Sequence, residues 1–308
     1  MAPAAPAASA SAAAPTDATA PPPPSVGIVE TARESVRLTT IWLARGVDSW
    51  FGDRPFSDGG KVTNGQLDLS LLKRQGDRLE ADVRLNARFA LPNIDHLGYV
   101  YVGRDNEREV ITDRPGALSR QDQLQNTRAQ DRAFFFGLGR TLNEAFDMRI
   151  GLRGAFKPYA QARLSLHWQL GADDSVDLRQ TLFWTVDDRA GSTTAVSFDH
   201  IFGPRLGVRW LSAATVTQAQ PKFAWASSLG AYQWFGGQRR LSFEALINGL
   251  QGSGVAAQDY GLQARWEQPV HDKWLLGGVV VGHFWPRPDA QSVRRGAWAL
   301  GVSLKMRF

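Results

Sequence analysis

The last thirteen residues, 296–308, read GAWALGVSLKMRF. Large apolar side chains take every second position up to the final phenylalanine, and small or polar side chains such as Lys305 and Arg307 stand between them. A period of two over this length predicts a β-strand with one apolar and one polar face, ending on an aromatic residue. The apolar set comprises Trp298, Leu300, Val302, Leu304, Met306 and Phe308.

The same alternation recurs upstream, most clearly over 79–91, 160–170 and 176–186. Fourteen stretches fit a strand, so we predict an all-β fold of fourteen antiparallel strands. These stretches are 63–73, 79–91, 97–104, 132–141, 147–157, 159–170, 175–187, 193–202, 205–217, 222–235, 240–250, 257–268, 273–285 and 295–308.

Two of these stretches are less regular than the others. The stretch 97–104 is short, and 132–141 loses its alternation across three consecutive phenylalanines. Without them twelve strands remain, so twelve is the fallback count. Either number is even, so the first strand begins and the last strand ends on the same side of a membrane. Lys157-Pro158 is one of several dipeptides that predict a hairpin turn between strands.

Composition narrows the class of protein. The chain has 308 residues, 35 Lys and Arg against 30 Asp and Glu, a formal net charge of +5, and no cysteine. It therefore has no disulfide, thiolate metal site or cysteine nucleophile, and so mild a charge does not predict nucleic-acid binding. The predicted strands are longer than the roughly five or six residues usual in globular proteins and suit the roughly nine to eleven of a membrane strand. We therefore predict a transmembrane antiparallel β-barrel rather than a soluble sandwich.

The chain divides into three segments. Residues 1–24 are rich in Ala and Pro and predict a disordered tether. Residues 25–60 hold an amphipathic helix over 25–52 and a lead-in to the barrel, which occupies 61–308. The helix either packs beneath the barrel on the periplasmic side or plugs its lumen, and the sequence leaves both arrangements open.

The C-terminal strand resembles the last strand of bacterial outer-membrane β-barrels. This resemblance implies the outer membrane of a Gram-negative bacterium as the location, with the N-terminus in the periplasm. It implies outer-membrane lipid and lipopolysaccharide as partners. It also implies that the barrel-assembly machinery reads the apolar set from Trp298 to Phe308 as an assembly signal. A periplasmic partner that binds through 25–52 is a further expectation.

Three short motifs are similar to a group of small, uncharacterised proteobacterial outer-membrane barrel proteins. The similarity covers residues 45–308 and implies a fold and a location, but no activity. The motifs are Trp50-Phe51-Gly52-Asp53, Phe89-Ala90-Leu91-Pro92 and Phe284-Trp285-Pro286-Arg287.

Ser165, His167 and Asp177 are the weak candidates for a catalytic site. Ser165 and His167 lie two residues apart on one strand face, and a turn centred on Ala172 sets Asp177 across the hairpin from His167. A serine, a histidine and an aspartate together suggest a lipid hydrolase. Because a polar lumen produces such clusters by chance, we expect no enzyme. No histidine spacing fits a metal site, and no cofactor is expected.

Charged side chains of the predicted strands share the face opposite the apolar one and are expected to line a lumen. Opposite charges on adjacent strands, such as Asp68 and Arg84, are expected to neutralise each other across the wall. The expected lining residues are Asp68, Glu80, Asp82, Arg84, Arg88, Arg163, His167, Asp177, Arg179, Arg209, Glu244, Arg265, Glu267, Lys305 and Arg307.

Three functions fit these features. The first is a porin-like passive channel for small hydrophilic solutes, with a slight cationic excess in the lumen that favours anionic ones. In such a channel the long charged connection 105–131 can fold inward as a constriction. The alternative is a structural or partner-anchoring protein with a filled lumen. The third is a lipid-modifying barrel enzyme.

Overall fold

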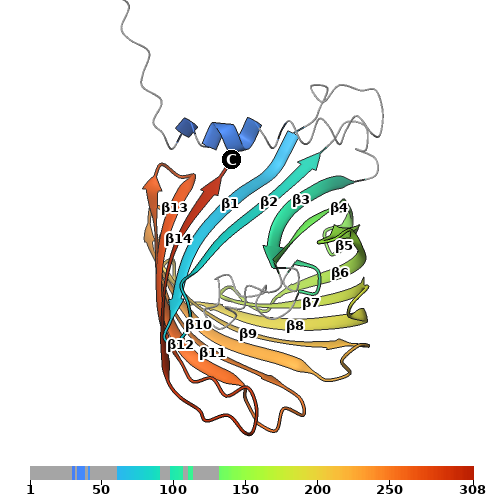
Figure 1. The fold of residues 1–308 in the computed structure, drawn as a ribbon. Helices are drawn as coiled ribbons and strands as arrows, with labels where there is room; N and C mark the ends of the chain where they lie inside the picture. Colours follow the sequence, from blue (N-terminus) through green and yellow to red (C-terminus); the bar gives the residue numbers. More distant parts are fainter. Residues whose placement is uncertain are drawn as a thin grey trace, which may run out of the picture.

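The computed structural model describes residues 30–31, 33–38, 41, 61–90, 98–106, 110–113 and 132–308. Its strands form one closed antiparallel barrel of fourteen members, in which β1 pairs with β14 (Figure 1). The predicted all-β barrel and its strand count are confirmed. The strands are β1 (Lys61–Arg74), β2 (Glu80–Ala90), β3 (Tyr99–Asn106), β4 (Arg132–Asn143), β5 (Phe146–Arg153), β6 (Lys157–Gln169), β7 (Asp174–Thr185), β8 (Arg189–Ile201), β9 (Leu206–Thr217), β10 (Ala224–Gly236), β11 (Arg239–Leu250), β12 (Asp259–His271), β13 (Leu275–Phe284) and β14 (Ala297–Arg307).

One expected hairpin turn lies elsewhere. Lys157 and Pro158 were predicted to form the turn between the fifth and sixth strands, but both belong to β6, where Pro158 pairs with Leu152. The chain turns over residues 154–156 instead, and Gly154 and Phe156 adopt φ values of 49° and 59° there. A glycine supplies a positive φ without steric cost, whereas a proline at the start of a strand is tolerated.

The outer face of the barrel is apolar. Leu71 on β1, Ile150 on β5, Trp184 on β7, Leu262 on β12 and Leu300 on β14 are all large, apolar and exposed to the surroundings. Each lies on the strand face that points away from the lumen. An apolar band around a closed barrel is the surface that hydrocarbon chains cover in a membrane.

The inner face is polar, and strand register makes it continuous from strand to strand. Asp68 on β1 stands directly opposite both Arg84 on β2 and Lys305 on β14. Further round the wall, Thr181 on β7 stands opposite both Arg163 on β6 and Thr193 on β8. Because successive strand residues point to opposite faces, every second residue of each strand joins this inner face.

The irregular strand β4 shows why its alternation was hard to read. Phe135 points into the lumen, is 4% exposed and packs 6.4 Å from the Tyr101 ring, while Phe134 is exposed on the outside. Inward tyrosines of β3 lie over the backbone of Gly137 and Gly139, which leave room for the rings. The inner face is therefore partly aromatic here, and polarity alone does not mark it.

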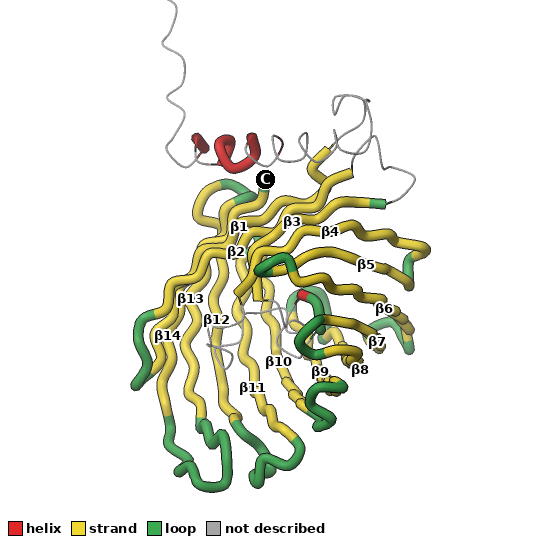
Figure 2. Tube along the Cα trace, turned by 45° about the vertical axis from the view of Figure 1, so that its right-hand side comes forward, coloured by secondary structure: helices red, strands yellow, loops and turns green. Residues whose placement is uncertain are grey.

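Helical residues of the segment 30–41 lie outside the ring of strands, beside the mouth that carries the C-terminus (Figures 1 and 2). We call this end the C-terminal mouth and the other end the distal mouth. None of the described helical residues belongs to a helix long and apolar enough to cross a bilayer. The tether 1–24, the limits of the 25–52 helix, Trp50-Phe51-Gly52-Asp53 and Leu91-Pro92 lie outside the described residues.

A glycine substitution tests the aromatic packing on β4. A Cβ on Gly139 would overlap the Tyr99 ring, so we expect Gly139→Ala to lower the free energy of unfolding by about 1–3 kcal/mol through overpacking. Urea titration of the folded, heat-modifiable band on gels measures this loss. Gly171→Ala is the matched control, because its nearest neighbour would be 3.8 Å away. Equal midpoints for the two variants would contradict the packing described here.

Candidate functional site

The strand register places all fifteen expected lining residues on the inner face of the barrel. They form a wall of alternating charge rather than one compact site. Arg84 illustrates the pattern: it faces Asp68 in register, while its Nε donates to Asp82 Oδ2 at 2.8 Å and lies 3.6 Å from Asp105 Oδ1. Charges therefore neutralise one another along a strand as well as across strands.

The described part of the long connection, 110–113, lies inside the barrel against β6, β7 and β8 (Figure 2). We call this segment the loop tip. Gln161 Nε2 donates to the Ile111 carbonyl at 2.6 Å, and Thr193 Oγ1 donates to the Thr112 carbonyl. Ile111, Thr112 and Asp113 are at most 3% exposed. The tip is thus fixed to one side of the lumen by hydrogen bonds to its backbone.

Asp113 fastens the loop tip most strongly. Its carboxylate accepts a hydrogen bond from Arg163 Nη2 at 2.7 Å, and Arg163 Nε lies 2.7 Å from its other oxygen. Thr181 Oγ1 donates to the same carboxylate at 2.6 Å, and Arg179 lies 3.8 Å away. Two-pronged arginine–carboxylate contacts are among the strongest polar contacts in proteins. Asp113 adopts a φ of 48°, an uncommon value for a residue with a side chain, which this docking maintains.

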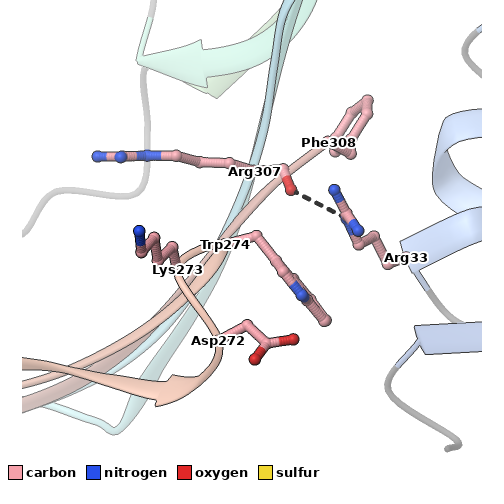
Figure 3. Close-up of a pocket in the computed structure, with 6 residues that line it drawn as sticks. All are labelled: Arg33, Asp272, Lys273, Trp274, Arg307 and Phe308. Carbon is pink, nitrogen blue, oxygen red and sulfur yellow. Dashed lines mark hydrogen bonds between the residues drawn. The ribbon is translucent and has the colours of Figure 1, made fainter.

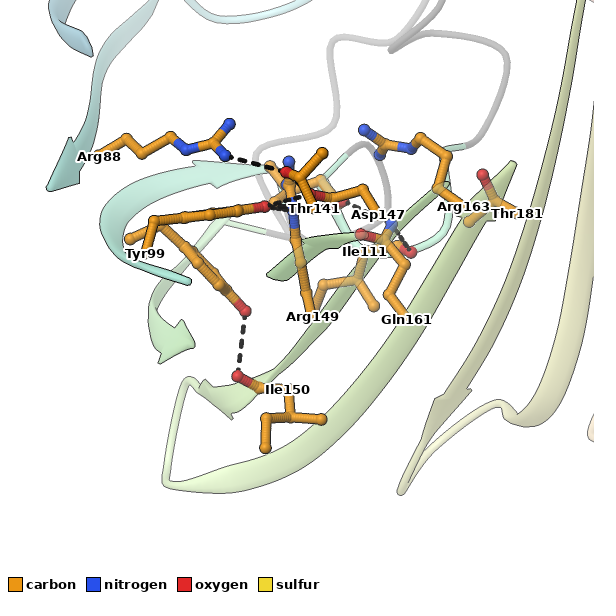
Figure 4. Close-up of polar contacts among 12 residues, drawn as sticks. Arg88, Tyr99, Ile111, Thr141, Asp147, Arg149, Ile150, Gln161, Arg163 and Thr181 are labelled. Carbon is orange, nitrogen blue, oxygen red and sulfur yellow. Dashed lines mark hydrogen bonds and ion pairs between the residues drawn. The ribbon is translucent and has the colours of Figure 1, made fainter. Parts of the chain in front are cut away.

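A second network borders the tip (Figure 4). Tyr99 OH donates to Asp147 Oδ2 at 2.7 Å and accepts from Arg149 Nε at 2.9 Å, while Arg149 Nε also lies 3.0 Å from Asp147 Oδ1. The Arg88 guanidinium stacks 3.2 Å from the centre of the Tyr99 ring and reaches Thr141. These contacts fill the lumen wall between β2 and β5 and hold Arg88 against the wall.

The hydrolase candidates are only partly assembled. His167 Nδ1 lies 2.6 Å from Asp177 Oδ1, as the predicted hairpin register requires. Ser165 instead stands opposite Arg179, and none of the described contacts joins its hydroxyl to His167. Asp177 also accepts from Ser197 at 3.3 Å and lies 3.8 Å from Arg209. A nucleophile needs its base within hydrogen-bond reach, and this arrangement does not provide one.

Two further clusters on the inner face are each centred on an acidic side chain. Asp199 accepts from Arg209 Nε and Nη2, both at 2.6 Å. On the neighbouring strands Glu244 accepts from Tyr232 and Gln263, again at 2.6 Å, and is 3% exposed. Each acid has its donors in place, so these clusters stiffen the barrel at a low cost of desolvation.

Lys305 and Arg307 differ from the rest of the wall. They are inward neighbours near the end of β14, and no described residue forms an ion pair or hydrogen bond with either side-chain cation. The Arg307 carbonyl, by contrast, accepts from Arg33 Nε at 3.3 Å. Two cations without an ion-pair partner among the described residues therefore lie near the C-terminal mouth, although Asp68 stands opposite Lys305 in register.

A cleft of about 530 Å³ separates the helical segment from the C-terminal mouth (Figure 3). Arg33 lies 4.8 Å from the centre of the Trp274 ring, and Asp272 and Phe308 also line the cleft. Ligand atoms of Glu30, His271 and Asp272 come within 4.8 Å of one another nearby. The sequence predicted no metal site, and these three residues are exposed.

An ion cluster lies at the distal mouth. Arg153 is 2% exposed, and its Nη2 donates to Asp187 in the β7–β8 turn at 2.9 Å. Lys157 donates to the same carboxylate at 3.0 Å. The hydrogen bond from Lys157, with the charges of Lys157 and Arg153, lowers the pKa of Asp187. Asp187 therefore favours the folded state at neutral pH, and this contribution is lost as the pH falls through the lowered pKa.

The apolar set of the last strand lies on its outer face. Trp298, Leu300 and Val302 are exposed, and Trp298 packs edge-on 4.7 Å from His283. Met306 is buried, and Phe308 covers Gly65. An exposed apolar strand with an aromatic end is compatible with the predicted assembly signal, which the structure does not test.

Sequence reasoning missed several important lumen residues. Asp113 lies in the connection 105–131, which the sequence marks only as long and charged, and nothing local marks it as the anchor. Tyr99 lies in the predicted strand 97–104, and its ring points inward, where an aromatic residue is not expected from polarity alone. Arg149 and Arg240 lie on predicted strands and could have been found by extending the alternation used for their neighbours.

Comparisons with known proteins give structural similarities at low sequence identity. No protein-family model and no curated protein matches the chain. Similar solved structures include an anion-selective porin from Comamonas acidovorans, at 12% identity and a TM-score of 0.47, covering 81% of this chain and 100% of that one. The outer membrane channel DcaP of Acinetobacter baumannii has 11% identity and a TM-score of 0.48, covering 83% and 99%. A KdgM porin has 8% identity and a TM-score of 0.38, covering 79% and 99%. At such identities no residue role is transferred from these proteins.

Thiol labelling tests the docking of the loop tip, because the chain has no cysteine of its own. We expect a Thr112→Cys thiol to react slowly in the folded barrel, since Thr112 is 2% exposed. Asp113→Ala in that background removes the partner of Arg163, and we expect labelling at least about tenfold faster as the tip opens. Asp177→Ala is the matched control. An unchanged rate after Asp113→Ala would show that Asp113 does not hold the tip.

Proposed function

We propose that this protein is a porin-like passive channel of the Gram-negative outer membrane for small hydrophilic solutes. The observation that carries the proposal is a polar, accessible surface inside a closed apolar-coated barrel. The side chains of His167, Asp177 and Arg179 face the lumen and remain 58%, 41% and 40% exposed. Charged side chains that stay exposed inside a closed barrel are in contact with water, which is the medium a passive solute needs.

The docked loop tip supports a size limit for such a channel. Residues 110–113 occupy space inside the ring of strands and are held to β6, β7 and β8 by side chains of the wall. A segment fixed to one side of a barrel narrows the path without closing it on all sides. The solutes proposed are therefore small ones, which pass between the tip and the opposite wall.

The uncompensated cations support a preference for anions. Lys305 and Arg307 have no acidic partner among the described residues, whereas most other inward cations are paired. Charged rings and clusters in a pore select ions of opposite sign. We propose that these two residues make the C-terminal mouth attractive to anionic solutes.

We further propose the orientation and partners of the barrel. Because the strand count is even, β1 begins and β14 ends at the same mouth, which we assign to the periplasm. The apolar outer face fits outer-membrane lipid, lipopolysaccharide at the outer leaflet, and the barrel-assembly machinery during biogenesis. A periplasmic partner would then meet the helical segment of 25–52, whose described part lies at that mouth.

We propose no enzymatic role for Ser165, His167 and Asp177, because the serine lacks a base within reach. Purified protein is expected to leave phospholipid intact, at a rate that His167→Ala does not change. Fatty-acid release from mixed micelles measures this. Turnover that disappears in His167→Ala would overturn the assignment and favour a lipid hydrolase.

Planar-bilayer recording tests the channel and its preference. We expect stepwise conductance and a reversal potential on the anion side in a KCl gradient. A unit charge at about 4 Å in water is worth about 1 kcal/mol, so reversing both cations by Lys305→Glu with Arg307→Glu should lower the chloride-to-potassium permeability ratio roughly fivefold or more. Heat-modifiable mobility on gels confirms that the variant is folded.

Arg205→Glu is the control for this experiment, because Arg205 is an exposed turn residue at the same mouth. We expect it to change the ratio little. If both variants shift the ratio equally, the preference comes from the overall field and not from the lumen. A folded barrel that never conducts would contradict the channel and favour the structural or partner-anchoring alternative.

A further inference from the structure

A small cavity lies in the lumen wall where the closing strands meet. It has a volume of about 60 Å³ and is bordered by the ends of β12 and β14, the beginnings of β11 and β13, and the facing parts of β1 and β2. A cavity needs roughly 10–15 Å³ of this kind of volume for one water molecule, so this one admits a group of a few heavy atoms. It is distinct from the space beside the loop tip, which borders β6 to β8.

The cavity lies where the inner face of β13 has a glycine, next to the inward Leu276. Gly278 points inward opposite both Glu267 and Ser303. A Cβ on Gly278 would come within 2.6 Å of Ser303 Oγ and 3.6 Å of Glu267 Cγ. A larger residue would fill the hollow, so the glycine keeps it open between charged neighbours.

The lining is strongly cationic. Five basic side chains border the cavity against two acidic ones, Asp68 and Glu267. Glu267 is paired with Arg240 and lies 3.8 Å from Arg265, while Arg84 pairs with Asp82. The two cations of β14 complete the set without an acidic partner among the described residues. Hydroxyl groups of Ser70 and Ser303 add neutral donors on the same wall.

The two acids decide which anion fits. A carboxylate beside an anion repels it unless the anion carries a proton that the carboxylate can accept. Inorganic phosphate and phosphate monoesters keep such a proton in part near neutral pH, whereas sulfate does not. Donors from several directions also suit a tetrahedral oxyanion with oxygens on all sides.

Building on the proposed channel, we propose that this cavity is a binding subsite for a protonated tetrahedral oxyanion, namely hydrogen phosphate or the phosphate group of a small solute. Lys305 and Arg307 bind the charged oxygens, the serine hydroxyls donate to them, and Asp68 or Glu267 accepts the proton of the P–OH group. The subsite makes the channel favour phosphate over other anions, in addition to favouring anions over cations.

Chloride current through the full-length protein in planar bilayers provides the first test. We expect sodium phosphate at pH 7 to block the current saturably and sodium sulfate of equal ionic strength to block it at least about tenfold more weakly. Lys305→Gln should weaken the phosphate block about tenfold, which corresponds to about 1.4 kcal/mol. Arg205→Gln, in a turn at the same mouth, is the matched control and should leave the block unchanged.

Asp68→Asn separates proton recognition from simple attraction. Without this carboxylate only Glu267, which is paired with Arg240, remains to repel sulfate. We therefore expect the preference for phosphate over sulfate in block to fall several-fold in this variant. Gly278→Leu should abolish the block by filling the cavity. Equal block of the unmodified channel by phosphate and sulfate would overturn the proposal, and so would a phosphate block that Lys305→Gln leaves unchanged.

Calorimetric titration with inorganic phosphate keeps the subsite testable if the barrel does not conduct. Saturable binding to the folded protein in detergent, weakened by Lys305→Gln and not by Arg205→Gln, would support the subsite even though the channel had failed. Conductance without phosphate block or phosphate binding would support the channel and contradict the subsite. A folded barrel that neither conducts nor binds phosphate would contradict both proposals.

Discussion

The pairing of β1 with β14 is the constraint on which the rest of the barrel depends. Nine residue pairs, from Gln66 with Arg307 to Arg74 with Ala299, close the sheet on itself. An open sheet would expose unpaired N–H and C=O groups, which hydrocarbon cannot satisfy. Closure also defines an inside, because only a closed sheet gives the polar strand faces a common space. The same seam brings Asp68 opposite Lys305 and joins the two sides of the cavity that five basic side chains border.

The sequence alone predicts most of the strands and which of their residues point inward. A membrane barrel imposes a period of two on each strand, so 79–91 and 296–308 reveal their inward positions without any tertiary information. The alternation of apolar and polar residues disappears where the same residue type lies on both faces of a strand. In β4, Phe135 packs beside inward tyrosines while Phe134 is exposed on the outside. Short-range turn chemistry was less informative. Pro158 lies within β6, because a proline at the start of a strand needs no partner for its missing N–H.

The docking of the loop tip could not be predicted, since it depends on the depth at which a long connection enters the lumen. Asp113 meets Arg163 and Thr181, which are separated from it by 50 and 68 residues along the chain. No periodicity links such positions, and the connection holds several acids that are equally suitable on sequence alone. That Lys305 forms no ion pair with any described residue was likewise not predictable, because Asp68 stands opposite it in register and the alternation suggested a pair.

Paired and unpaired charges have different consequences for a polar lumen. An arginine held by a carboxylate at 2.6 Å, as Arg209 is by Asp199, contributes rigidity but little net field. An unpaired cation contributes field, and its cost is small only where water remains near it. Lys305 and Arg307 stand at the mouth, where water is available, whereas Arg163 lies deeper beside the buried Asp113. Paired charges therefore tie neighbouring strands together, whereas the two cations without an ion-pair partner among the described residues lie at the C-terminal mouth, which is the arrangement that the proposed channel requires.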